Sequence, residues 1–77
     1  MNRAETLKYL YDNCTDDMNL DGIDENELIA TIGDDGEDVV NELYKMGFIR
    51  CIANYEGIHV YLSRLGKLYL TELFNLT

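Results

Sequence analysis

Between two apolar segments of the chain lies a run of side chains with oxygen atoms, and their spacing is that of a metal-binding loop. Asp17, Asn19 and Asp21 match the D-x-N-x-D-G opening of an EF-hand calcium loop. Such a loop needs a bidentate Glu at its twelfth position, where this chain has Leu28, with Glu27 one residue early. We therefore expect a polar loop that leads into a helix, and calcium binding by Asp17, Asn19 and Asp21 is the weaker alternative.

The other side chains able to bind a metal or act as nucleophiles are few. Cys14 and Cys51 lie far apart, His59 is the only histidine, and the three match no zinc spacing. No serine or cysteine nucleophile has an assignable base with an orienting acid. We interpret the cysteines as reduced thiols and His59 as a surface imidazole. A chain of 77 residues also has little room for a deep substrate pocket, so we expect no enzymatic activity, no cofactor and no metal.

The acidic residues are concentrated in one part of the chain. The net charge is −9, and residues 1–44 hold thirteen acidic and two basic residues, whereas residues 45–77 hold two acidic and four basic ones. An acidic domain is repelled by nucleic acid and by anionic membranes. No apolar run approaches the roughly 18 residues of a membrane span, and the first residues lack the apolar region of a signal peptide. We therefore expect a cytoplasmic protein that does not contact a membrane.

The spacing of apolar residues predicts four helices, three of them in the first part of the chain. The first covers residues 3–14. The second begins after Asp24, which forms a capping-box pair with Glu27, and it ends at Gly33. The third ends at Gly47 and has an inward apolar stripe. That stripe consists of Val39, Val40, Leu43 and Met46.

A β-hairpin and a last helix follow. Residues 48–53 are apolar and β-branched, residues 54–57 form a turn, and residues 58–62 alternate with period two. Ser63 then caps a helix that runs to about Asn75. The alternation places Ile58, Val60 and Leu62 on one face of the second strand, and His59 and Tyr61 on the other.

This order of elements, with a short strand expected within residues 15–22, is similar to that of winged helix-turn-helix domains. The segment L-Y-K-M-G-F-I resembles that family's L-x-x-x-G-(F/L)-I exit from the third helix, and L-S-R-L-G-K-L-Y-L resembles its L-T-x-x-G-x-x-(Y/L)-L entry to the last helix. The resemblance covers about residues 4–76. It implies a single α+β domain over residues 1–77, with a three-helix core, a β-hairpin wing and an additional C-terminal helix. It also implies that the third helix enters the DNA major groove while the wing contacts the backbone or minor groove.

The third helix, however, is acidic where the family contacts DNA. Base readout uses Arg, Lys, Asn or Gln, and carboxylates repel phosphates instead of releasing counterions. We therefore predict a small non-enzymatic regulatory protein that acts through protein contacts, with mimicry of nucleic acid as one form of that role. The expected partner is a basic or nucleic-acid-binding protein. The residues expected to contact it are Asp34, Asp35, Glu37, Asp38, Asn41 and Glu42.

The alternative is a dimeric DNA-binding transcriptional regulator. Only Asn41 and Lys45 on the third helix have suitable side chains. Arg50 on the first hairpin strand and Tyr55 at the turn would add contacts from the wing.

The last helix holds more apolar residues than one core face needs. They spread over about two-thirds of the helical wheel, whereas a helix that covers one core needs a face nearer 100° wide. We expect the extra face, with Leu70 and Phe74, to be exposed in a monomer and to form a homodimer interface. Tyr9 and Leu73 are expected to join it. The alternative is that the first helix covers this face within one chain.

Overall fold

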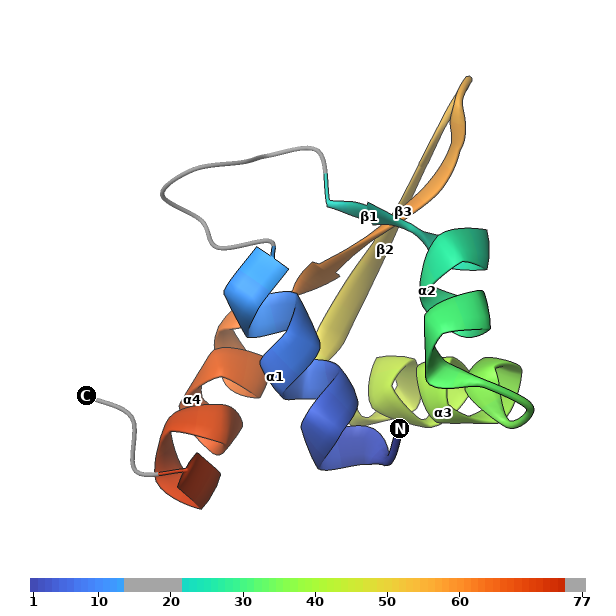
Figure 1. Cartoon of the computed structure of the whole chain (residues 1–77). Helices are drawn as coiled ribbons and strands as arrows, with labels where there is room; N and C mark the ends of the chain where they lie inside the picture. The colour runs from blue at the N-terminus through green and yellow to red at the C-terminus, as the bar shows by residue number, and fades with distance from the viewer. Residues whose placement is uncertain (14–21, 75–77) are drawn as a thin grey trace.

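The computed structural model describes residues 1–13 and 22–74, with the backbone alone at Phe74. Within these residues, four helices and a three-stranded antiparallel sheet form a mixed α+β fold (Figure 1). The elements are α1 (Arg3–Asn13), β1 (Ile23–Asp24), α2 (Glu25–Ile32), α3 (Gly36–Met46), β2 (Ile49–Asn54), β3 (Gly57–Leu62) and α4 (Arg64–Phe74). The predicted order of helices and hairpin is confirmed. Residues 15–21 lie outside the described residues, and the short strand observed is β1, which comes just after them.

The sheet has the order β1-β3-β2, so that β3 pairs with both neighbours. Val60 lies at its centre, opposite Ile23 on one side and Cys51 on the other. Val60 is fully buried and Leu62 is partly buried against the core, as the alternation predicted. Ile58 has the same facing but is exposed, because the hairpin extends beyond the helices toward its tip (Figure 1).

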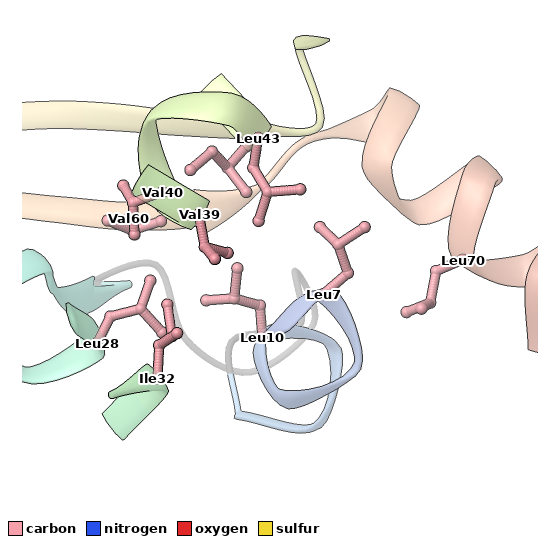
Figure 2. Packing of buried hydrophobic residues seen from close by; sticks show 10 residues of the cluster. Leu7, Leu10, Leu28, Ile32, Val39, Val40, Leu43, Val60 and Leu70 are labelled. Carbon is pink, nitrogen blue, oxygen red and sulfur yellow. The ribbon is translucent and has the colours of Figure 1, made fainter. Parts of the chain in front are cut away.

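The core lies where α1 meets α2, α3, α4 and the sheet (Figure 2). It consists of Leu7, Leu10, Leu28, Ile32, Val39, Val40, Leu43, Ile49, Val60 and Leu70. Val39, Val40 and Leu43 confirm the predicted inward side of α3. Met46 does not, because it is exposed at the last turn of the helix.

The predicted N-cap of α2 and the predicted glycine ends of α2 and α3 are confirmed. The Asp24 carboxylate accepts hydrogen bonds from the backbone N–H groups of Asn26 at 3.0 Å and Glu27 at 3.2 Å, which satisfies donors at the start of α2. Gly33 ends α2 and Gly47 ends α3, the latter in the left-handed conformation with φ 81°.

The end of α3 and the start of α4 are joined by several hydrogen bonds and one ring contact, which together we call the α3–α4 junction. The Ser63 hydroxyl donates to the Gly47 carbonyl at 2.6 Å and accepts from the Gly66 N–H at 3.0 Å. The Ser63 N–H donates to the Phe48 carbonyl at 3.1 Å, and the Phe48 ring stacks on Tyr69 with centroids 4.6 Å apart. The two motifs that resemble the winged-helix family, L-Y-K-M-G-F-I and L-S-R-L-G-K-L-Y-L, therefore contact each other at this junction.

Replacing Ser63 with alanine should lower the free energy of unfolding by about 1–2 kcal/mol, because it removes a helix cap and the bond to Gly47 together. Urea unfolding followed by circular dichroism measures the change. Thr31→Ala is the matched control, since Thr31 is exposed and, among the described residues, its hydroxyl bonds the Glu27 carbonyl of its own helix. A loss in Ser63→Ala no larger than in Thr31→Ala would show that the junction bonds do not stabilise the fold.

Candidate protein-contact surface

The six residues predicted to contact a partner are all exposed, at the turn between α2 and α3 and along α3. We call Asp34, Asp35, Glu37, Asp38, Asn41 and Glu42 the acidic surface. The buried side of α3 fixes their direction, because Val39, Val40 and Leu43 pack into the core (Figure 2). The structure therefore brings the predicted residues together on one rigid helix and the turn that precedes it.

Few contacts neutralise the carboxylates of this surface. Asp35 occupies the N-cap position of α3, but its side chain makes no cap hydrogen bond. Glu42 pairs with the Arg3 guanidinium at 3.0 Å, with both side chains half exposed. It is the only member of the surface in an ion pair within the described residues. An exposed pair of this kind contributes at most about 1 kcal/mol, so most of the negative charge remains available to a partner.

A groove of about 300 Å³ opens beside the acidic surface, between the start of α1, the end of α3 and α4. Asp38, Glu42 and Met46 follow one side of α3 at i, i+4 and i+8, so this row leads from the acidic surface to the groove. Arg3 connects the groove and the acidic surface, since it lines the groove and pairs with Glu42. The residues that line the groove are Asn2, Arg3, Ala4, Leu7, Leu43, Met46 and Tyr69.

The residues predicted for DNA binding are exposed but divided between two places. Asn41 and Lys45 lie one turn apart on α3, and Arg50 lies on β2. Tyr55 is 97% exposed at the turn between β2 and β3, and this tip of the hairpin stands away from α3 (Figure 1).

His59 is not the surface imidazole that we expected. Both ring nitrogens are buried and have no hydrogen-bond partner among the described residues. The alternation of β3 was predicted correctly, but β1 pairs with β3 at this point, so Asp24 and Ile52 flank His59 on the two neighbouring strands. A pairing between distant segments therefore covers a side chain that the local pattern places at the surface.

Cys51 and His59 do not form a shared metal site. Cys51 is opposite Val60 in the sheet, whereas His59 is opposite Ile52, so the two side chains leave opposite faces. Burial, with a smaller effect of the Glu25 carboxylate, raises the pKa of the Cys51 thiol. Because the thiolate is the nucleophilic form, this shift lowers the fraction of reactive Cys51 at neutral pH.

The calcium alternative falls on Asp17, Asn19 and Asp21, which lie outside the described residues, as does Cys14. In residues 1–13 and 22–74, no group of three or more His, Cys, Asp or Glu side chains is arranged to hold a metal ion. None of the helices in this part of the chain combines the length and the apolar character that a bilayer crossing requires.

The predicted dimer surface on α4 requires a correction. Leu70 is fully buried and lies on the side of α4 next to α1 and Leu7, so the expectation that it is exposed was wrong (Figure 2). Tyr9 is partly buried against the core, Leu73 is exposed as expected, and the side chain of Phe74 lies outside what the structure describes.

The exposed apolar residues that the sequence prediction missed on α4 are Leu65, Leu68 and Tyr69. Gly66 marks the inner side of α4 in the structure, because it is buried at the α3–α4 junction. Leu70 follows it at i+4 and therefore lies on the same side of the helix.

No protein-family model, curated protein or solved structure matches this chain. Its function is therefore inferred from its own charges and geometry.

Proposed function

We propose that this chain is a winged-helix domain that acts as a non-enzymatic regulatory protein, by contacting a basic protein through the acidic surface. The order of its helices and hairpin supports the winged-helix assignment. Placement in the cytoplasm is part of the proposal, since Cys51 is a free thiol.

The observation that carries the proposal is that the carboxylates of the acidic surface are exposed and mostly without a neighbouring cation among the described residues. Five lie within residues 34–42, all of them exposed on a helix and turn that the core holds in place. A surface that serves solubility alone usually mixes charges of both signs. Within the part of the chain that the structure describes, Glu42 is the one member of this surface with a cation in contact, so a facing positive surface would gain the remaining attraction.

The chemistry of this surface fits a partner rich in Lys and Arg. Residues at i and i+4, such as Asp38 and Glu42, have Cβ atoms roughly 5–6 Å apart, so their carboxylates are neighbours on the helix surface. A partner surface rich in Lys and Arg also binds the phosphates of nucleic acids, so an acidic helix can occupy that surface in place of nucleic acid. The same charges attract a basic partner from a distance and raise the rate of association.

DNA binding is the second candidate, and Tyr55 favours it. An aromatic side chain that is 97% exposed at the tip of a hairpin has no packing role and is suited to a contact with another molecule. Asn41, Lys45 and Arg50 would then contact bases and phosphates. The acidic surface opposes this candidate, because it brings carboxylates toward the same phosphates.

A paired capture experiment tests the leading proposal. Tagged wild-type protein is mixed with lysate of its native host, with and without nuclease treatment, beside the variant Glu37→Gln/Asp38→Asn. Glu5→Gln/Asp12→Asn is the control, because it removes two exposed carboxylates from α1 and gives the same net charge. We expect wild type and control to recover the same partner, and the acidic-surface variant to recover at least about tenfold less.

Two outcomes would contradict the proposal. Equal recovery by all three proteins would show that the acidic surface is not the contact. Recovery that disappears after nuclease treatment would show that nucleic acid carries the interaction, which supports the DNA-binding alternative. Circular dichroism confirms that each variant is folded.

A further inference from the structure

One side of α4 exposes several large apolar side chains. Leu65, Leu68, Tyr69 and Leu73 are exposed by 51, 60, 40 and 49%. We call them the outer face of α4. Gly66 and Leu70 are buried on the other side of the helix, against the α3–α4 junction and α1. The helix therefore has two apolar sides, of which residues 1–13 and 22–73 cover one.

The outer face is held in a fixed shape. Tyr69 stacks on Phe48 at 4.6 Å between ring centroids. Leu70, which Figure 2 shows on α4, is fully buried, and this burial fixes the rotation of the helix. Met46, exposed at the end of α3, lines the same groove as Tyr69 and extends the apolar area. A rigid apolar area of this kind on a small protein marks a contact with another molecule.

The charges on this face identify the occupant. Arg64 begins α4 and Glu72 lies eight residues later, with Leu68 midway between them. Neither residue has an ion-pair partner within the described part of the chain. If two copies of α4 pack antiparallel about Leu68, Arg64 of each copy meets Glu72 of the other. Parallel packing would instead bring like charges together, and an apolar partner would leave Glu72 desolvated without a cation.

We propose that the outer face of α4 binds a second copy of this chain. The two α4 helices pack antiparallel across a two-fold axis at Leu68, with two Arg64–Glu72 pairs at its ends. The overall charge distribution agrees with this contact. Residues 45–77 hold four basic and two acidic residues, so the contact joins the halves of the chain that do not carry the negative charge. The inference is independent of the proposed acidic-surface contact.

The mass of the protein in solution, measured by analytical ultracentrifugation over a concentration series, tests this interface. The wild type should have the mass of two chains at micromolar concentration. Leu68→Glu, which places two carboxylates at the axis, should raise the dissociation constant on the order of a hundredfold. Tyr44→Glu is the matched control, because Tyr44 is an equally exposed large side chain on α3, and it should leave the mass unchanged.

A charge exchange tests the antiparallel pairing. Arg64→Glu and Glu72→Arg should each weaken the dimer about tenfold, and the double variant should return to within about threefold of wild type, because it restores both pairs in reverse. A wild type with the mass of one chain at every concentration would overturn the proposal. A dimer unaffected by Leu68→Glu, or a double variant that stays as weak as the single ones, would overturn it as well. All of these positions are exposed, and circular dichroism verifies the fold of each variant.

Discussion

Replacing Gly66 with alanine is expected to lower the free energy of unfolding by roughly 2–3 kcal/mol. Gly66 is buried, and a Cβ atom at this position would overlap the carbonyl oxygen of Phe48 and approach Leu62 Cδ1 to 2.9 Å. The Phe48 carbonyl cannot move away freely, because it accepts the 3.1 Å hydrogen bond from the Ser63 N–H. A domain of this size has a total stability near 5 kcal/mol, so the substitution should remove about half of it.

Whether Gly66→Ala lowers or raises the free energy of unfolding shows whether the α3–α4 junction is as tightly packed as described. In an unobstructed helix, alanine is more stable than glycine by about 1 kcal/mol, so Gly66→Ala would be stabilising if the α3–α4 junction left room for a methyl group. Urea unfolding of the variant and the wild type under identical conditions measures the difference. An increase in stability would show that α4 does not approach Phe48 as closely as the structure has it.

Features set by neighbouring residues could be predicted from the sequence. Asp24 caps α2, and Gly33 and Gly47 end their helices, because each of these effects depends on a few adjacent residues. The inward direction of Val39 and Val40 follows from the single apolar stripe of α3. The acidic surface could be predicted for the same reason, since one apolar side determines the exposed one.

Features that depend on distant contacts could not be predicted. The last helix has apolar residues on most of its circumference, so its pattern alone did not reveal that Leu70 is inside and Leu68 outside. The ring nitrogens of His59 are buried where β1, from a separate part of the chain, pairs with β3, and Glu42 pairs with Arg3 from the first helix. The requirement for glycine at position 66 could not be predicted either. It follows from the contact in which Ser63 bonds both Gly47 and Gly66, and neither of the two short sequence motifs indicates that contact by itself.

Charge, rather than shape, is what we expect to keep α3 from binding DNA, and the variant Asp38→Lys/Glu42→Lys tests this. Both residues are exposed on the side of α3 that carries Asn41 and Lys45. Each substitution removes a repulsion from phosphate and adds a cation that releases counterions. The variant should therefore bind a short DNA duplex at low salt on the order of a hundredfold more tightly than wild type, with an affinity that falls steeply as salt rises.

Fluorescence anisotropy of a labelled duplex measures this affinity across a salt series. Glu5→Lys/Asp12→Lys is the control, because it gives the same net charge through α1 and should gain far less affinity. Equal gains in both variants would show that net charge alone governs the interaction and that α3 has no special access to DNA. Tight binding by the wild type would instead favour the DNA-binding alternative. The expected result separates fold from function: α3 would have the shape to approach a duplex, and its carboxylates would direct it to a basic protein instead.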